Sequence, residues 1–354
     1  RQKTSRRLFV DIPLAHQEGE QLDLNFVLDK LKPVFLDETI QKVGQNLKYD
    51  LNVLKHEEIE VKGPFFDTML ESYILNSSQI RHNMDAMALR FLNHQTTKFE
   101  DVAGKGAKQI TFDHVDIETA GHYACEDADI TLQLHKYLMP RVKAMPKLRK
   151  VFDSLEMPLM PILADIEYQG VLIDKNVLAK QSIVLTKQLQ EYKTEAFDLA
   201  GKEFNMNSPK QLQVILFEEL ELPIIKKTPK GQPSTAEAVL QELAHDYPLP
   251  SIILKYRSIY KLLTTYVDAL PTRINEHTGR VHTSYNQAVT ATGRLSSSEP
   301  NLQNIPIRTP EGRNVRHAFI ARDGYKLLAC DYSQIELRIM AHLSRDEGLV
   351  EAFS

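Results

Sequence analysis

The spacing of apolar and polar residues changes along the chain. A short apolar run at residues 8–14 predicts a strand, and apolar residues three or four apart then predict helices. These helices are expected at Leu22–Phe35, Ile40–Leu54, Asp67–Leu75, Asp85–Leu92 and Asp116–Leu138. A strand followed by helices favours an α/β layer domain for this part of the chain.

Prolines interrupt the pattern between residues 140 and 161. Because proline breaks helices and strands, we place a domain boundary near residue 146. Beyond it, helical patterns are expected at residues 175–200, at Asn207–Leu212 and at residues 248–275, with a loop at Lys226–Ser234. Strands and loops are expected from Gly279, and a short apolar strand at Leu327–Cys330 leads into a helix from Ser333.

The composition is that of an ordinary globular protein, because 42% of the 354 residues are hydrophobic and 25% are charged. That length is enough for two domains. No apolar run approaches the roughly 18 residues that a membrane helix needs, so no membrane contact is expected. Cys125 and Cys330 form no metal-ligand pattern and fit a reducing cytoplasm. The chain starts at Arg1 rather than Met and stops at Ser354, soon after a helical pattern, so both ends look cut.

Charge is unevenly distributed along the sequence. Residues 251–330 contain 11 Lys and Arg against 5 Asp and Glu, although the whole chain has a net charge of −4. A basic stripe on an acidic protein is what a track for a phosphate backbone would look like. Chance surface composition explains the same count, so charge alone leaves both interpretations open.

One helical pattern places a carboxylate within an apolar face. On the helix predicted at residues 116–138, Tyr123 and Leu134 share a face with Asp127. A carboxylate there is costly unless it is paired or binds a metal ion. Asp50 lies at the edge of a similar, weaker face. Each aspartate has structural alternatives, namely an N-cap, a buried salt bridge or a position on a ridge.

Two segments resemble motifs of the DnaQ-like 3′–5′ exonucleases. They are Val43-Gly-Gln-Asn-Leu-Lys-Tyr-Asp50 and Tyr123-Ala-Cys-Glu-Asp127. In that family, acidic residues hold two metal ions that activate water and stabilise the leaving oxygen. The resemblance implies that Asp50 and Asp127 bind metal and that Tyr123 positions the water. The pocket for a single-stranded DNA 3′ end would be lined by Asn46 and Tyr49. The family's first motif, Asp-x-Glu on a strand, is not found in this sequence.

The stretch 290–306 is rich in amide and hydroxyl groups. Its Asn301, Gln303 and Asn304 side chains can both donate and accept hydrogen bonds, and Arg294 adds a charged fork. A·T and G·C pairs present minor-groove acceptors at equivalent places, so such a loop suits an enzyme that senses pairing without reading sequence. The same residue types also make ordinary polar loops, which the chemistry alone favours.

Asp331 follows the predicted strand at Leu327–Cys330, at the mouth of a turn where a metal ligand is well placed. Ser333 and Glu336 have the spacing of a capping box, in which each side chain bonds to the backbone of the other. Glu336 therefore has a purely structural interpretation as a helix cap.

The segment Asp331-Tyr-Ser-Gln-Ile-Glu-Leu-Arg338 matches motif A of the family A DNA polymerases, and the stretch 290–306 matches the motif that precedes it. By this resemblance the chain is identified as a member of that family, of the bacterial kind with a proofreading domain. The implied fold class is α/β. Residues 1–145 would be an N-terminally truncated RNase H-like 3′–5′ exonuclease domain. Residues 146–354 would be the helical thumb and first part of the palm of the polymerase, truncated at the C-terminus.

The resemblance also implies roles for individual residues. Asp331 and the backbone carbonyl of Tyr332 would bind two Mg²⁺ ions, and Glu336 would pack against the sugar of an incoming deoxynucleoside triphosphate. Further contacts to the nucleotide and to primer–template DNA are assigned to Arg294, Asn301, Gln303, Asn304, Arg308 and Gln334. The thumb would hold the duplex backbone through Lys255, Arg257 and Lys261.

The implied reaction is DNA synthesis on a template, in replication and repair, with 3′–5′ proofreading by a monomer in the cytoplasm at the nucleoid. The family's triphosphate-binding helix and second catalytic carboxylate are not found in this sequence, so we expect the chain alone to be inactive. Two alternatives stay open. One is a non-catalytic DNA-binding remnant. The other is a stand-alone 3′–5′ exonuclease, against which residues 280–340 argue.

Overall fold

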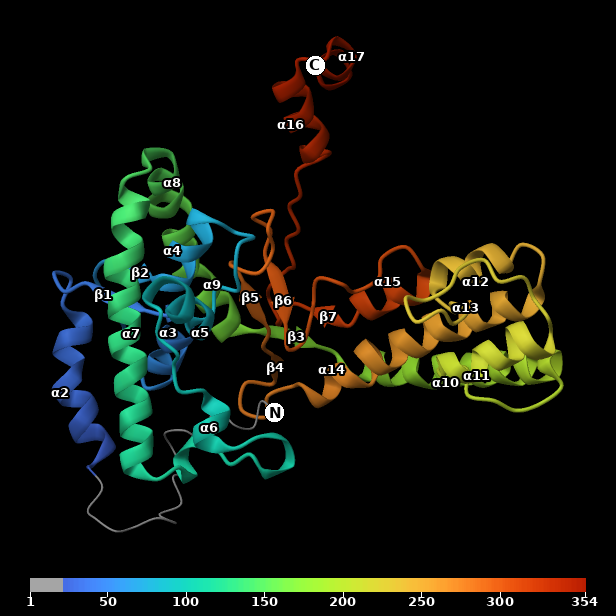
Figure 1. Cartoon of the computed structure of the whole chain (residues 1–354), viewed down its shortest axis with the longest axis horizontal. Coiled ribbons are helices and arrows are strands. Elements are labelled where there is room, and N and C mark those ends of the chain that lie inside the picture. Colours follow the sequence, from blue (N-terminus) through green and yellow to red (C-terminus); the bar gives the residue numbers. More distant parts are fainter. Residues whose placement is uncertain (1–21) are drawn as a thin grey trace.

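The computed structural model describes residues 22–354, so the strand predicted at residues 8–14 lies outside the described residues. A first part, residues 22–169, is built around the long helix α7 (Ile117–Lys143). A second part, residues 170–354, contains a long helical arm. At the C-terminal end of the chain, two short helices stand apart from the rest of the protein (Figure 1). These two are α16 (Ile335–Ser344) and α17 (Glu347–Phe353).

The first part has a small parallel sheet with helices around it. Strands β1 (Lys42–Gly44) and β2 (Phe65–Asp67) pair with Val43 opposite Phe66. The other helices are α2 (Leu24–Leu36), α3 (Leu47–His56), α4 (Thr68–Leu75), α5 (Met84–Met87), α6 (Phe99–Ala103), α8 (Pro146–Val151) and α9 (Met157–Gln169). Short 3-10 or π-helical segments are η1 (Ala88–Leu92), η2 (Gly106–Lys108), η3 (Phe112–His114) and η4 (Phe152–Glu156).

The helices predicted at residues 22–35, 67–75, 85–92 and 116–138 are confirmed, with ends that shift by a few residues. The helix predicted at Ile40–Leu54 is wrong in its first half, because β1 occupies residues 42–44 and α3 begins only at Leu47. Asn46 precedes α3 with a φ of 58°, in the left-handed region. That conformation turns the chain sharply and separates the strand from the helix.

Two apolar clusters hold the first part together. One consists of Leu47, Leu70, Met139, Val142, Phe152 and Met160, and the other of Met87, Ala88, Ile130, Leu134 and Leu138. Because Phe152 and Met160 belong to the first cluster, the proline-rich stretch after residue 140 is packed helix. The domain boundary near residue 146 stays a prediction.

The second part contains two small antiparallel sheets. Strand β3 (Val171–Ile173) lies between β4 (Arg280–Val281) and β7 (Phe319–Ile320), and β5 (Ser284–Asn286) pairs with β6 (Ser296–Ser298) as a hairpin. The other helices are α10 (Lys175–Ala200), α11 (Pro209–Gln213), α12 (Glu237–Leu243), α13 (Pro248–Leu262), α14 (Ala269–Thr272) and α15 (Pro310–Arg316). Two π-helical segments are η5 (Val214–Glu219) and η6 (Leu263–Val267).

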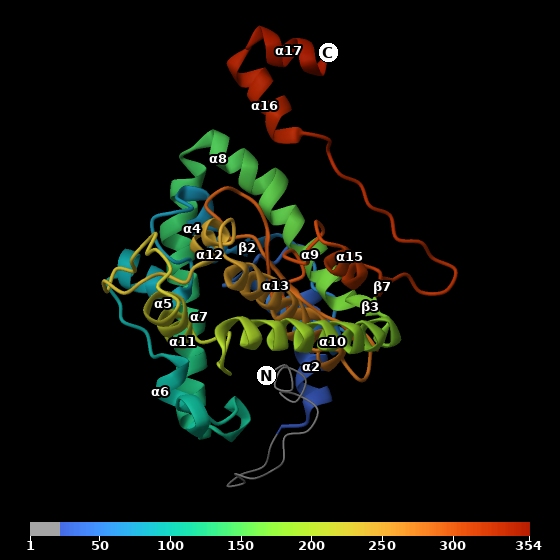
Figure 2. The ribbon, with the colours of Figure 1, turned by 90° about the vertical axis from the view of Figure 1, so that its right-hand side faces the viewer.

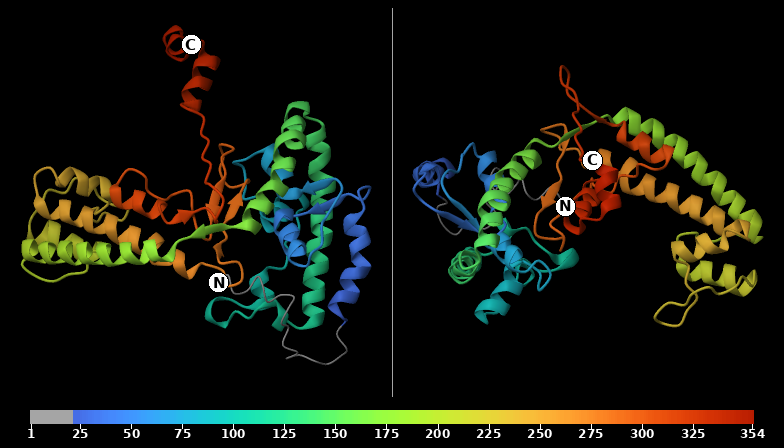
Figure 3. Two further views of the ribbon diagram at one scale, coloured as in Figure 1. Left: turned by 180° about the vertical axis from the view of Figure 1, so that it is seen from behind. Right: turned by 90° about the horizontal axis from the view of Figure 1, so that it is seen from above.

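The helical arm, residues 175–275, confirms the helices predicted there. Helices α10 and α13 run side by side along it, as the view from above shows (Figure 3). Apolar residues from both helices, among them Leu178, Leu185 and Ile259, form the core near its base. Helix α11 follows the N-cap Ser208, within the segment where a helix is predicted. Figure 2 shows α10 running lengthwise across the view.

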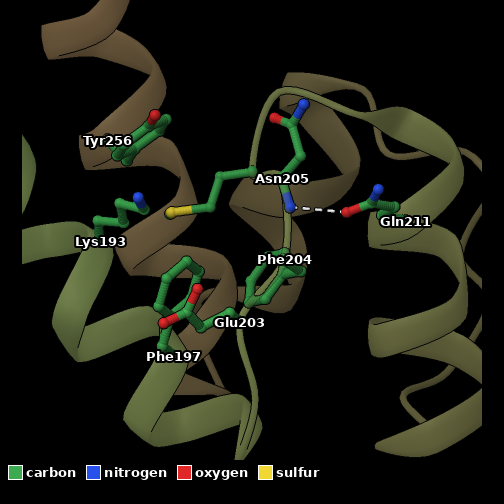
Figure 4. Close-up of a pocket in the computed structure, with 8 residues that line it drawn as sticks. Lys193, Phe197, Glu203, Phe204, Asn205, Gln211 and Tyr256 are labelled. Atoms are coloured by element: carbon green, nitrogen blue, oxygen red, sulfur yellow. Dashed lines mark hydrogen bonds between the residues drawn. The ribbon is translucent and has the colours of Figure 1, made fainter.

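A pocket of about 410 Å³ lies in the helical arm, between α10, α13 and the loop that precedes α11 (Figure 4). Its walls combine the aromatic rings of Phe197, Phe204 and Tyr256 with polar side chains. The backbone N–H of Asn205 donates to Oε1 of Gln211 at 2.7 Å and fixes the loop that forms one wall.

Two predictions near the C-terminal end are wrong. Residues 327–330 form no strand, and Leu328 is 88% exposed, because no described strand pairs with this segment. The capping box of Ser333 and Glu336 is also absent: α16 begins at Ile335, and Gln334 precedes it with a φ of 52° and no side-chain cap. Within residues 22–354, no helix combines the length and apolar character needed to cross a membrane.

Candidate functional sites

Asp67 fixes the start of helix α3, which carries the predicted nuclease residues Tyr49 and Asp50 and is preceded by Asn46. Its carboxylate accepts hydrogen bonds from the backbone N–H groups of Asn46 (3.0 Å) and Leu47 (2.8 Å). It also caps α4 by accepting from Met69 N at 2.9 Å. Asp67 is fully buried, and this burial raises its pKa to about 6 although the backbone N–H groups act in the opposite direction.

Asp50 lies in the first turn of α3, near Asp67. Although the residue as a whole is exposed, partial desolvation of its carboxyl group and the negative charge of Asp67 raise its pKa to about 6. A carboxyl group that is costly to ionise gains from a cation beside it. Asn46 and Tyr49 flank it on the same turn and are exposed, Tyr49 by 49%. These positions leave all three side chains open to a ligand.

Tyr123 and Asp127 lie one turn apart on α7, as the helical spacing predicts. Desolvation, and then the charge and hydrogen bond of Asp127, raise the pKa of Tyr123 to about 12. Desolvation also raises the pKa of Asp127, against the effect of its bond to Tyr123. Its Oδ1 atom is buried and has no hydrogen-bond partner. A buried carboxylate oxygen without a partner is costly, and a metal ion would satisfy it.

Two further carboxylates surround Asp127, and the sequence patterns did not single them out. Asp85 and Glu126 both raise the pKa of Asp127 through their negative charge. Asp85 accepts from Thr96 Oγ1 at 2.7 Å, and Glu126 accepts from Thr97 N at 2.9 Å. Their signal was weak, because Asp85 stands at the start of a predicted helix and Glu126 is next to Asp127, positions where an ordinary carboxylate is common.

The nuclease residues do not form a complete metal centre by themselves. Among residues 22–354, no group of three or more His, Cys, Asp and Glu side chains is arranged to hold a metal ion. The structure thus places Asp50 near Asp67, and Asp127 beside Tyr123. It does not bring these two pairs together into one cluster.

The stretch 290–306 includes β6 and the loops on either side of it. Asn301 accepts from the backbone of Gln303 through Oδ1 at 3.0 Å, and the carbonyl of Asn304 accepts from Tyr266 Oη at 2.7 Å. All three amide residues are exposed. The backbone of the stretch is therefore held by the protein, while the side chain of Gln303 faces solvent.

Arg294 in this stretch contacts helix α16. Its Nη2 donates to Oε1 of Glu336, the second residue of α16. Both side chains are largely exposed, by 71% and 67%. Asp331 and Tyr332 lie on the extended segment before α16 and are also exposed. Arg308 is exposed as well, and its carbonyl accepts from Arg313.

The three predicted phosphate-binding residues of the helical arm differ in their surroundings. Lys255 and Lys261 are exposed on α13. Arg257 is only partly exposed, and its guanidinium donates to the carbonyls of Met206 (3.4 Å) and Thr235 (2.9 Å). Burial also lowers its pKa. The two lysines can therefore reach a ligand, whereas Arg257 fastens the end of the arm.

Comparison with known protein families decides which family the chain belongs to. The model described as "DNA polymerase family A" matches residues 175–354, and the model described as "3'-5' exonuclease" matches residues 3–143. The chain belongs to DNA polymerase family A. The predicted fold class, an exonuclease domain followed by a family A polymerase domain, is confirmed. Polymerases and exonucleases of these families generally use divalent metal ions.

Relatives of this family A chain are bacterial proteins named DNA polymerase I. The chain is 58% identical to the one from Pseudomonas aeruginosa and 46% identical to the one from Rhizobium leguminosarum, in each case over 97% of its own length. It covers 38% and 35% of those relatives, so it spans little more than a third of their length.

A solved structure supports the same assignment for the family A chain. It is described as the POL domain of Pol1 from M. smegmatis in complex with DNA primer-template and dNTP. The two share 34% sequence identity with a TM-score of 0.77, over 94% of this chain and 55% of the other. The agreement extends across both parts of the fold.

Proposed function

We propose that the chain takes part in template-directed DNA synthesis, in which a primer 3′-hydroxyl attacks a deoxynucleoside triphosphate, in replication and repair. The family A match over residues 175–354 carries this proposal. A 3′–5′ exonuclease that removes mispaired ends is proposed for the first part, on the match over residues 3–143. Such a protein would act as a monomer on the chromosome, at the nucleoid in the cytoplasm.

The residues proposed for the polymerase site include the ion pair of Arg294 with Glu336. Asp331 and the carbonyl of Tyr332 offer oxygen donors in an exposed segment, which fits Mg²⁺. A bound pair of Mg²⁺ ions would activate the attacking oxygen and stabilise the leaving one. Glu336 would fill the space beside the sugar of the incoming nucleotide and exclude a 2′-hydroxyl. Arg294 would then leave Glu336 and donate a hydrogen bond to an acceptor of the duplex instead.

Further amide and guanidinium groups between residues 301 and 334 would hold the primer end. They offer donors to the minor-groove acceptors that A·T and G·C pairs share, so they would sense base pairing without reading sequence. The residues assigned to this contact are Asn301, Gln303, Asn304, Arg308 and Gln334.

For the exonuclease, Asp50 and Asp127 are the proposed Mg²⁺ ligands. The buried Oδ1 of Asp127 without a partner fits this role. Tyr123 would orient the attacking water through its hydroxyl. The exposed side chains of Asn46 and Tyr49 would line the pocket for the single-stranded 3′ end.

The helical arm would hold the duplex by its phosphates, and DNA binding tests the whole proposal. A labelled primer–template is titrated with the chain at several salt concentrations. We expect weak affinity that falls as salt rises, because phosphate contacts release counterions. The variant Lys255→Glu/Lys261→Glu should bind about 10-fold or more weakly, alike for every sequence. The matched control is Lys30→Glu/Lys32→Glu, which reverses two exposed charges on α2.

Affinity that does not depend on salt would overturn the proposal, and so would a strong sequence preference or an equal loss in both variants. A second candidate function, non-catalytic DNA binding, is favoured by the absence of a three-ligand metal group among residues 22–354. Primer extension by the purified chain with Mg²⁺ and deoxynucleoside triphosphates would exclude this candidate. Binding without extension would support it.

A further inference from the structure

Tyr73 belongs to the first part but bonds to a loop of the second part. It lies on α4, and only 4% of it is exposed. Its hydroxyl donates to the carbonyl of Thr290 at 2.8 Å and accepts from the backbone N–H of Gly293 at 3.1 Å. These residues are more than 200 positions away in the sequence. One phenol thus bonds to both sides of a tight turn.

The turn that Tyr73 holds leads directly to Arg294. Gly293 has a φ of +78°, in a region that other residues rarely adopt. Thr290 Oγ1 donates to the carbonyl of Arg294 at 2.5 Å, so the turn closes on the arginine backbone. The direction in which the Arg294 side chain leaves the loop is therefore set by the turn.

Tyr73 itself is fixed by its neighbours. Its ring meets that of His82 edge-on, with 5.5 Å between centroids. His82 is buried, which lowers its pKa, and its Nδ1 lies 2.9 Å from Ser72 Oγ. A buried, bonded histidine provides a rigid wall, so the phenol has little freedom to follow a moving loop.

A second bond holds the same turn. Ser77 follows α4, and its hydroxyl donates to the carbonyl of Ala291 at 3.1 Å. Three backbone groups of residues 290–293 are therefore bound by side chains of the first part.

We propose that Tyr73 is a positioning residue for DNA contact by the polymerase: from the exonuclease part, it holds the turn that aims Arg294 at the minor groove of the primer end. This inference rests on the proposed function of Arg294. It makes the first part a structural support for the polymerase contact, separate from any nuclease chemistry.

The test measures how strongly the chain senses one minor-groove acceptor. Two primer–template duplexes are compared, one ordinary and one in which a carbon replaces the purine N3 acceptor at the primer end. The readout is the ratio of the two dissociation constants, since only a correctly aimed donor distinguishes the duplexes. The chain should bind the ordinary duplex about 10-fold more tightly if one charged hydrogen bond is involved.

Four variants are measured beside the wild type, each with a melting curve. Arg294→Ala should bring the ratio to about 1. Tyr73→Phe keeps the ring but removes both bonds, and the ratio should fall by about 3- to 5-fold, as expected for one or two hydrogen bonds. Ser77→Ala should lower it less. The matched control is Tyr137→Phe, because Tyr137 lies on α7 and stacks on Phe91; its ratio should equal that of the wild type.

The outcomes separate the inference from the proposed function. If Arg294→Ala keeps the preference, or the wild type has none, the assignment of Arg294 fails and the inference fails with it. If Arg294→Ala removes the preference while Tyr73→Phe and Ser77→Ala retain it in full, only the inference is overturned. A lower affinity of Tyr73→Phe for both duplexes with an unchanged ratio would show a merely structural role and also overturn it.

Discussion

Arg294 and Glu336, 42 residues apart in the sequence, form an ion pair between the loop after β5 and the first turn of α16. The pair is exposed, and we propose that its two residues contact DNA and the sugar of the nucleotide. Each side chain is thus held by the other. Ligand binding at either residue would compete with this contact.

Replacing Glu336 should therefore raise the affinity for DNA without lowering the stability of the fold. We expect Glu336→Gln to change the free energy of unfolding by less than about 1 kcal/mol, since exposed ion pairs contribute little. Affinity for primer–template should rise by about 2- to 5-fold, because the variant frees Arg294 and removes a negative charge. Thermal melting and anisotropy titrations measure the two effects. A loss of stability well above this value would contradict the expectation.

Two lysines on α3 offer a matched pair for measuring the contact between α3 and α9. Lys48 bonds to Glu167 with both side chains about 10% exposed, whereas Lys55 bonds to Asp165 with 41% and 59% exposed. Lys48→Met should cost about 3–5 kcal/mol, because Glu167 is left buried without its counter-charge. Lys55→Met should cost at most about 1 kcal/mol. Equal effects in urea unfolding would contradict this.

Asp67 should make stability depend on pH in the metal-free chain. Its pKa is about 6 in the folded protein, against about 4 in an unfolded chain. Folding thus favours the protonated form, so this contribution is complete below pH 4 and is lost as the pH rises to 6. The Tm of the wild type should therefore fall relative to that of Asp67→Asn over that interval, because the asparagine does not titrate. A constant difference from pH 4 to 7 would show that burial does not shift this group.

Arg257 should contribute more to the stability of the fold than to DNA binding. Arg257→Met removes donors from the carbonyls of Met206 and Thr235, and it should destabilise the chain by about 1–3 kcal/mol. Lys255→Met, on the exposed side of α13, should change stability by less than about 0.5 kcal/mol and weaken DNA binding instead. Denaturation and DNA titrations on both variants check this. If Lys255→Met is the less stable of the two, the assignment is reversed.

The elements with strong local patterns could be predicted from the sequence, and so could the family, from its motifs. Helix α7 with Asp127 and Tyr123 on one face follows from spacing alone, and so does α10. The strand at residues 42–44 was missed because its partner, β2, lies more than 20 residues away and a three-residue strand leaves no periodic pattern. The strand predicted at residues 327–330 failed for the opposite reason: its residues are apolar, but no described strand pairs with them.

The site was predictable as a set of residues but not as a set of contacts. Family motifs single out Arg294 and Glu336, yet their spacing gives no sign that they bond to each other. Tyr73 lies in an ordinary helical pattern, and its partners are over 200 residues away. Asp67 was placed only as a helix start, although its carboxylate also fixes α3. Contacts of this kind depend on the folded path of the chain, which local patterns do not contain.

The Lys48–Glu167 contact also limits how this protein can be divided. Lys48 bonds to the carbonyl of Tyr285 as well, and Glu167 accepts from the backbone N–H of the same tyrosine. One buried charge pair is thus shared by α3, α9 and β5. Expressing the first part without residues 280–300 would expose one side of the charge pair to water. Expressing the second part alone would remove the hydrogen-bond partners of β5. The two parts should therefore melt in a single cooperative transition.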